Sequence, residues 1–308
     1  MSKAKLAIAL STLSVAMVVW AVPQSGIAHQ RVQRAESRSN VARIAPIRLR
    51  DERDRGLLAN GWINGAGPFT FVIDTGAGVS LISRSVVERA GLRVTKSRRP
   101  LVGGLSTSPI SSDQEAHISG LALGSSNNDV PGNFNAAVVA SLPGSIDGVL
   151  DPTEAFSPLG YTVDLPNREL RAFDTRLRLT DVPKDGAVVR WVREAGSDRP
   201  FVRLGDGRLA LIDTGSSLGL ALNGGSGANH RRSDNSVHDL GGGVVQSHRI
   251  EPQVVTIGSL VLNKVPTDML TGVAPGTPII LGRGALFPFR ITFDPASRLI
   301  AFEPAERD

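Results

Sequence analysis

Two acidic residues stand where apolar segments end, and Thr-Gly follows each of them directly. Asp74 closes the run FVID, and Asp213 closes the run LALID. Strand interiors disfavour Asp, and a buried carboxylate is costly unless it has a partner. Two carboxyl groups within hydrogen-bonding distance share one proton, so one can activate a water while the other polarises a carbonyl. The pair therefore predicts acid–base chemistry carried out by two aspartates.

The Thr and Gly of each motif suit this chemistry. We expect Thr75 and Thr214 to hydrogen-bond across the interface between the two motifs and so to hold the two loops together. Gly76 and Gly215 permit a tight turn and leave backbone N–H groups facing the carboxylates. A single Asp-Thr-Gly is also compatible with an ordinary turn, but two copies after two apolar strands favour a functional pair.

The residue after each motif differs between the two copies. It is Ala77 in the first and Ser216 in the second. A Ser hydroxyl can donate a hydrogen bond to the neighbouring carboxylate and favour its charged form, whereas Ala cannot. This difference predicts that Asp213 ionises more readily and that Asp74 holds the shared proton.

The two motifs lie in a tandem repeat. The segment YTVDLPNRELRAF (161–173) matches ITFDPASRLIAF (291–302), and residues 101–124 resemble residues 239–263. The chain has 33 Gly and only 5% aromatic residues, which favours many turns and short strands over long helices. One short helix is expected over 83–92. Ser83 or Ser85 would cap this helix, and Gly91 would end it.

These motifs resemble those of the aspartic peptidases of the pepsin-like and retropepsin-like superfamily. FVIDTGAG is similar to the active-site loop of the retroviral type, and LIDTGSS to the pepsin-like version. The resemblance spans roughly 57–304. It implies a mostly β fold in which two homologous retropepsin-like β-barrel lobes form a bilobal acid-protease fold in one chain. It also implies that Asp74 and Asp213 are the catalytic pair, and that Leu281 and Gly282 pack against the second loop.

The chain departs from the family pattern at two places. Asp151 stands where the first half should have the Gly that corresponds to Gly282, and it would either distort the packing beside the Asp74 loop or add a surface acid. The only Tyr, Tyr161, lies in a late hairpin and so cannot serve as a flap residue. The substrate-binding flaps are therefore expected at two glycine clusters, namely Gly103 and Gly104 in the first half and Gly241, Gly242 and Gly243 in the second.

The remaining segments predict an exported protein. Lys3 and Lys5 precede an apolar run, which is typical of an export signal. The expected organisation is a signal peptide or membrane anchor (1–28), a basic linker or pro-segment (29–56), an N-terminal lobe (57–174), an interlobe linker (175–186) and a C-terminal lobe (187–304). The location would be periplasmic or secreted, with anchoring in the inner membrane as the alternative.

The predicted function is that of an exported aspartic endopeptidase, active as a monomer on peptide or protein substrates. The absence of Cys, of metal-ligand spacing among the five His and of a phosphate-binding loop predicts no metal and no cofactor. The net charge of +5 is not clustered enough to predict nucleic-acid binding. Two alternatives stay open: a non-catalytic protein that binds peptides or envelope polymers on a degenerate peptidase fold, and a weaker one, an anionic-polymer binder.

Overall fold

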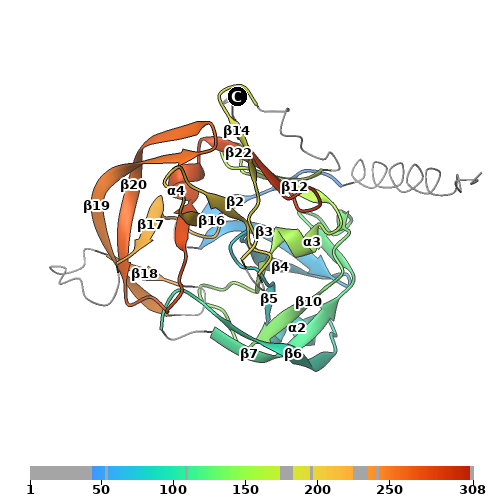
Figure 1. The fold of residues 1–308 in the computed structure, drawn as a ribbon. Coiled ribbons are helices and arrows are strands. Elements are labelled where there is room, and N and C mark those ends of the chain that lie inside the picture. Colours follow the sequence, from blue (N-terminus) through green and yellow to red (C-terminus); the bar gives the residue numbers. More distant parts are fainter. Residues whose placement is uncertain are drawn as a thin grey trace, which may run out of the picture. The chain divides into compact units, whose positions relative to one another are not determined.

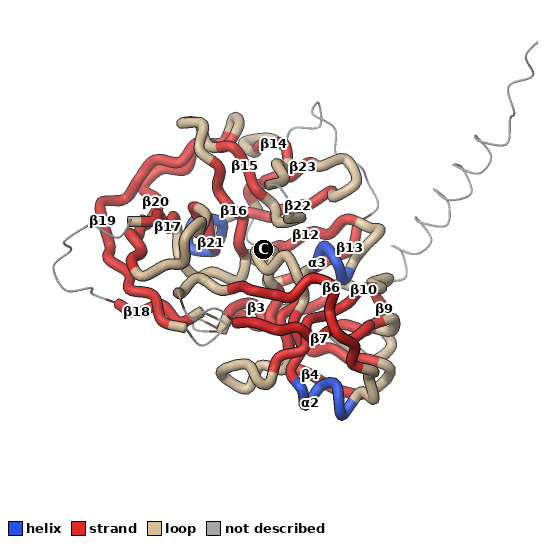
Figure 2. The backbone as a smooth tube through the Cα atoms, turned by 60° about the horizontal axis from the view of Figure 1, so that its bottom comes forward, coloured by secondary structure: helices blue, strands red, loops and turns tan. Residues whose placement is uncertain are grey.

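Strands dominate the computed structural model, which describes residues 44–52, 55–107, 110–173, 183–194, 197–224, 235–239 and 243–305. Figure 2 shows the strands in red and only short helical segments in blue. The labelled helices are α2 (Arg84–Arg89), α3 (Pro152–Ala155) and α4 (Arg283–Leu286). The predicted mostly β fold is thus confirmed. None of the described helices is long and apolar enough to cross a membrane, and the predicted export segment lies outside the described residues.

The first sheet has ten strands, and Asp74 directly follows one of them. Its order is β6-β7-β10-β5-β11-β4-β3-β8-β9, and β2 pairs with β3. These strands are β2 (Arg50–Glu52), β3 (Gly56–Ile63), β4 (Ala66–Ile73), β5 (Leu81–Ser83), β6 (Val94–Gly103), β7 (Ile110–Ile118), β8 (Leu121–Leu123), β9 (Asp129–Val130), β10 (Phe134–Val139) and β11 (Gly148–Leu150).

The second sheet has seven strands and contains Asp213. Its order is β15-β16-β21-β17-β20-β19-β18. In Figure 1 its orange strands β17, β19 and β20 lie apart from the green strands β6, β7 and β10 of the first sheet. The strands are β15 (Phe201–Arg203), β16 (Leu209–Asp213), β17 (Leu220–Asn223), β18 (Asn235–His238), β19 (Val244–Ile257), β20 (Leu260–Thr271) and β21 (Ile279–Gly282).

The two sheets share one pattern of strand pairing. In the first, β11 is parallel to β4 and antiparallel to β5, and in the second β21 is parallel to β16 and antiparallel to β17. Next in order, β5 is parallel to β10 and β17 is parallel to β20. Within the described residues, however, the end strands of each sheet do not pair with one another, so neither sheet closes. The expectation of β-barrel lobes is therefore wrong in this respect, because both sheets are open.

A third sheet joins the two halves of the sequence. Its order is β1-β13-β12-β22-β23-β14, so β12 from the first half pairs directly with β22 from the second. The two hairpins that the sequence repeat identified thus lie side by side. The strands are β1 (Ile47–Arg48), β12 (Gly160–Asp164), β13 (Glu169–Phe173), β14 (Ala187–Arg190), β22 (Phe289–Asp294) and β23 (Leu299–Pro304).

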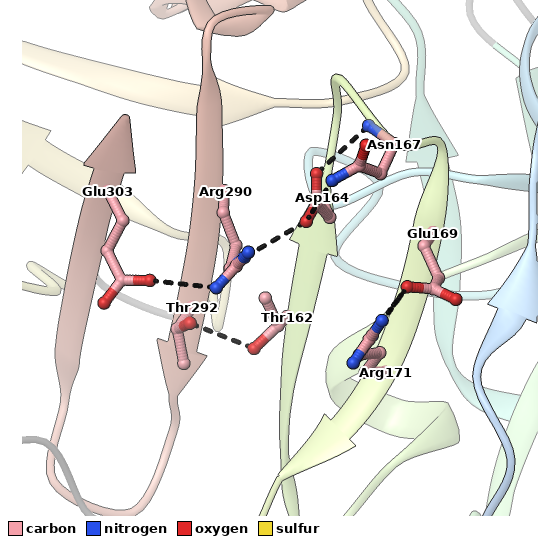
Figure 3. Close-up of polar contacts among 8 residues, drawn as sticks. All are labelled: Thr162, Asp164, Asn167, Glu169, Arg171, Arg290, Thr292 and Glu303. Carbon is pink, nitrogen blue, oxygen red and sulfur yellow. Dashed lines mark hydrogen bonds and ion pairs between the residues drawn. The ribbon is translucent and has the colours of Figure 1, made fainter. Parts of the chain in front are cut away.

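Polar and aromatic contacts hold this junction together. Thr162 and Thr292 face each other across β12 and β22 with their hydroxyl oxygens 2.9 Å apart (Figure 3). Arg290 donates to Asp164 at 3.1 Å across the same pair of strands. On the buried side, the only Tyr stacks on Phe293 with ring centroids 4.7 Å apart. The junction therefore fixes the two halves of the sequence against each other.

Two local expectations can be compared with the structure. Helix α2 forms where a helix was expected, but the side chain of its N-cap residue Ser83 makes no capping hydrogen bond. Its hydroxyl oxygen instead lies 3.0 Å from that of Ser85. Residues 47–52, assigned from the sequence to a basic linker or pro-segment, contribute β1 and β2 to the sheets. Most of the expected interlobe linker lies outside the described residues.

Candidate active site

Each candidate catalytic Asp is placed by a buried parallel pair of strands. Residue Ile73 of β4 pairs with Leu150 of β11, and the Asp74 N–H donates to the Leu150 carbonyl at 3.0 Å. In the second sheet Asp213 ends β16 beside Gly282 of β21. Strands that are buried on both faces hold their ends firmly, so both carboxyl groups are presented from rigid positions.

Hydrogen bonds from two threonines hold the two loops together. The Thr75 hydroxyl donates to the Ile212 carbonyl at 2.7 Å and accepts a hydrogen bond from the Thr214 N–H at 3.1 Å. The Thr214 hydroxyl makes the reciprocal contacts, donating to the Ile73 carbonyl and accepting from the Thr75 N–H, both at 3.2 Å. Both threonines are fully buried. Four hydrogen bonds thus fix the distance between the two aspartates.

The glycines bring each loop against the opposite carboxyl group. A Cβ atom added to Gly76 would lie 2.7 Å from the Cγ atom of Asp213, and one added to Gly215 would lie 2.5 Å from the Cγ atom of Asp74. No side chain fits in these spaces. The Gly76 N–H donates to Asp74 Oδ1 at 2.8 Å. Each carboxyl group also shifts the pKa of the other. Because the Gly of each loop packs against the opposite carboxyl group, the two aspartates lie side by side.

The two carboxyl groups differ in their surroundings. Burial raises the pKa of Asp74 well above its usual value, and the nearby Asp213 raises it further. Burial also raises the pKa of Asp213, but backbone N–H donors and the positive charge of Arg283 oppose this shift. The charged form is thus better stabilised on Asp213. These shifts favour the proton on Asp74 over Asp213, which is the direction expected from the sequence.

The cause of this difference is not the Ser216 hydroxyl. The Ser216 backbone N–H donates to Asp213 Oδ1 at 2.9 Å, and a residue of any type could supply this contact. The Ser216 hydroxyl oxygen instead accepts a hydrogen bond from the Leu218 N–H at 3.3 Å. Ala77 occupies the corresponding place in the first loop and lines the cleft described below. The direction of the difference between the two aspartates agrees with the sequence analysis, but the Ser216 hydroxyl does not cause it.

Arg283 is a site residue that the sequence analysis did not name. It follows Gly282 and is 6% exposed, and its Nη1 atom donates to the carbonyls of Thr214 and Gly215 at 2.9 and 3.2 Å. Its Nε atom lies 3.7 Å from an oxygen of Asp51. A single basic residue in the apolar run IILGRGALF was a signal for such a role. Arg283 therefore supports the second loop and places a positive charge behind Asp213.

The expected support residues of the second loop lie against it. Leu281 is fully buried. A Cβ atom added to Gly282 would lie 2.5 Å from the Leu218 carbonyl oxygen and 2.8 Å from that of Ser216. Only Gly allows β21 to approach the loop this closely. In the first half, Leu150 is buried in the same way, but Asp151 replaces the Gly.

Asp151 behaves differently from both sequence expectations. It is 1% exposed, so it is not a surface acid, and the hydrogen bond between Asp74 and Leu150 beside it is intact. Its side chain accepts a hydrogen bond from the Thr153 N–H at 2.8 Å and caps α3. Burial and the nearby charge of Glu154 raise the pKa of Asp151 to about 7. The departure from the family pattern thus adds a buried acid near the first loop.

A single cleft of about 1650 Å³ contains both aspartates. The residues in its wall include both apolar and charged side chains. The apolar ones include Ala77, Val79, Leu81, Leu105, Ile110, Val149, Leu211, Val237 and Ile280, and the charged ones include Arg55, Lys96, Arg98, Glu115, Glu154, Asp198, Arg199 and Asp239. A cleft of this size accommodates an extended peptide of several residues.

The expected flap residues are only partly described. Gly103 ends β6, Gly104 follows it, and both line the cleft with Asp74 and Asp213. Gly243 directly precedes β19, the second strand of the opposite hairpin, and lies against Ser106. Gly241 and Gly242 lie outside the described residues. Among the described residues, no group of three or more His, Cys, Asp or Glu is arranged to hold a metal ion.

Comparison with known proteins supports the resemblance for part of the chain. Residues 59–150 match the family model described as aspartyl protease. This range runs from within β3 to the end of β11 and contains Asp74, but it ends before the strand that carries Asp213. The search of curated proteins finds no match. Through the segment that contains its first Asp-Thr-Gly motif, the chain is similar to the retropepsin-like aspartic peptidases.

Proposed function

We propose that the protein is an exported aspartic endopeptidase that hydrolyses peptide bonds with Asp74 and Asp213. The observation that supports this proposal best is that Asp74 and Asp213 line one cleft and that each shifts the pKa of the other. The family match supports a protease-like function for the segment that supplies Asp74. Because both aspartates come from one chain, we infer that a single copy makes a complete site.

The electrostatics suggest a role for each aspartate. The ionised Asp213 accepts a proton from a water molecule, whose oxygen attacks the scissile carbonyl carbon. The protonated Asp74 donates its proton to the carbonyl oxygen, which gives a tetrahedral diol. When the diol collapses, Asp213 gives its proton to the amide nitrogen, a diol hydroxyl returns a proton to Asp74, and the C–N bond breaks to leave a carboxylic acid and an amine. Neither aspartate forms a bond to the substrate in this scheme.

The test compares three single substitutions on a mixed peptide library. Asp74→Asn and Asp213→Asn should each reduce hydrolysis by at least about a thousandfold, because the shared proton needs both carboxyls. Asp113→Asn makes the same chemical change at an exposed position on β7 and should leave turnover unchanged. Circular dichroism should show that all three variants are folded. Near-native turnover in either dyad variant would exclude this mechanism.

Binding of a peptide analogue with a central hydroxyl group gives an independent test. Such a compound mimics the tetrahedral diol and should bind the protein far more tightly than the parent peptide. Both dyad variants should lose this preference. A protein that binds the parent peptide and the analogue equally well would be a peptide-binding protein and not a peptidase.

A further inference from the structure

The tips of two hairpins from different sheets meet beside the cleft, and one carboxylate joins them. Asp239 follows β18, while Leu105 and Ser106 follow β6. Asp239 Oδ2 accepts hydrogen bonds from the N–H groups of Leu105 at 3.1 Å and of Ser106 at 3.0 Å. Its other oxygen, Oδ1, accepts from the Gly243 N–H of its own hairpin at 2.8 Å. One side chain thus ties the tip of the first hairpin to the second hairpin.

The contact is closely packed. Asp239 is 6% exposed and Ser106 is 2% exposed. A Cβ atom added to Gly243 would lie 1.8 Å from the Ser106 hydroxyl oxygen, and one added to Gly104 would lie 3.0 Å from Asp239 Oδ2. Hydrogen bonds to a buried charged group are stronger than those between neutral groups. The contact is therefore stable enough to hold the hairpins together.

A second contact fixes the same tip to the second sheet. The Ala274 N–H donates to the Leu105 carbonyl at 2.8 Å, and Ser106 forms an isolated antiparallel bridge with Val273. Leu105, Ser106, Asp239 and Ala274 all line the cleft that contains the two aspartates of the dyad. The joined hairpins therefore form a wall of the cleft to which both sheets contribute.

We propose that Asp239 is a specificity-determining latch, which keeps the hairpins joined and so favours short or unfolded peptides over loops of folded proteins. A short chain can enter the cleft from its ends. A loop held at both ends by a folded body must enter sideways, which requires the contact between the hairpins to open. The proposal rests on the proposed peptidase function, and Asp239 acts through the hairpins without touching the reacting atoms.

Asp239→Asn tests the latch directly. The carboxylate accepts three N–H donors with two oxygens, whereas Asn has one oxygen and would turn an NH₂ group toward an N–H. The amides of Leu105 and Ser106 should then exchange with deuterium about tenfold faster or more, since charged hydrogen bonds of this kind are lost. Asp113→Asn, on the same hairpin, should leave exchange at these amides unchanged. Unchanged exchange in Asp239→Asn would overturn the latch, whether or not the protein is a peptidase.

Kinetics test the consequence for specificity. One substrate is a short unstructured peptide, and the other is a folded protein that presents the same sequence in a surface loop. In Asp239→Asn the ratio of kcat/KM for the loop to kcat/KM for the peptide should rise by about tenfold. It should stay constant in Asp113→Asn. A constant ratio in Asp239→Asn, with hydrolysis of the peptide retained, would overturn the proposal while leaving the peptidase function intact.

A disulfide that locks the hairpin contact closed has the opposite effect to Asp239→Asn, which weakens the contact. The double variant Ser106→Cys/Val273→Cys places Cys at two residues that face each other in an antiparallel bridge, and the chain has no other Cys. When the disulfide is formed, cleavage of the loop substrate should fall relative to the peptide, and a reductant should restore the ratio. Opposite effects from the two variants would not arise from general destabilisation. Equal loop cleavage by the oxidised and reduced forms would contradict the latch.

Discussion

The buried acid Asp151 gives a prediction about stability whose size can be worked out. Its pKa rises from 3.8 to about 7 in the folded protein, chiefly because burial disfavours the charged form. Between these two pH values the unfolded chain has lost the proton while the folded protein keeps it. The folded state is therefore favoured at low pH, and this stability is lost as the pH rises to 7. At about 1.4 kcal/mol per pH unit, the total loss is about 4 kcal/mol.

Asp151→Asn should remove this dependence. The amide keeps an oxygen that can accept the Thr153 N–H and cap α3, but it has no charge to bury. The stability of the variant relative to the parent should therefore increase steadily from pH 4 to pH 7, by about 4 kcal/mol, and then level off. At pH 4 the difference in free energy of unfolding between the variant and the parent reflects only the exchange of a neutral acid for an amide, so this difference should be small.

Urea unfolding followed by circular dichroism at several pH values measures this difference. Both proteins should carry Asp213→Asn, so that self-cleavage does not interfere and the dyad contributes equally. Asp113→Asn in the same background is the matched control, because it makes the same chemical change at an exposed position of β7. A constant difference between Asp151→Asn and the parent from pH 4 to pH 8 would show that Asp151 is not buried as the neutral acid.

Three further substitutions test the environment of the dyad. Arg283→Met removes a charge that lowers the pKa of Asp213, so the acidic limb of the kcat/KM profile should move to higher pH. The variant also loses the hydrogen bond from Arg283 to the loop, which should reduce the free energy of unfolding by about 3 kcal/mol. An unmoved limb would contradict this role. Gly76→Ala places a methyl group against the Asp213 carboxyl and should lower kcat by about a hundredfold while the fold is retained; near-native kcat would show that the loop can move away. Ser216→Ala should leave the acidic limb in place, because the Ser216 hydroxyl accepts from the Leu218 N–H and only the backbone N–H of Ser216 contacts Asp213. A shifted limb would show that the hydroxyl stabilises the charged form of Asp213, as the sequence analysis expected.

The parts of the site that the sequence could predict are those with a local, repeated signal. Asp74 and Asp213 stand out because an acid after an apolar strand is unusual, and because the same tripeptide follows both. The tight approach of Gly76 and Gly215 follows from the same motif, since a residue without a Cβ atom marks a place where backbone must come close to other atoms. The mostly β fold was predictable for a similar reason, from many Gly residues and short apolar runs.

The parts that could not be predicted depend on contacts between distant segments. Arg283 contacts residues 214–215, and Asp239 contacts residues 105–106. Neither contact could be read from the sequence, because the residues in each pair are far apart in the chain. The hydrogen-bond partner of the Ser216 hydroxyl depends on the rotamer that this side chain adopts. Closure of a sheet depends on whether its end strands reach each other, and local strand propensity carries no information about that. The open sheets and the latch therefore needed the structure.

Part of the asymmetry of the dyad arises outside the two loops, at the residues that follow β11 and β21. The pairing of Leu150 with Ile73 and of Leu281 with Ile212 makes the residues that follow these two leucines equivalent. On the Asp213 side these residues lead to Arg283, whose positive charge lowers the pKa of Asp213. On the Asp74 side they begin with Asp151, whose negative charge raises the pKa of Asp74.

Both differences act in the same direction. A cation behind one carboxyl group and an acid behind the other separate two groups whose immediate loops are nearly identical in sequence. An acid–base pair requires such a separation, because one member must keep a proton while the other gives it up. Asp151 is neutral below about pH 7, so its contribution to the asymmetry grows as the pH rises above that value. The departure from the family pattern would then help Asp74 to keep its proton above about pH 7, where an isolated carboxylic acid is ionised.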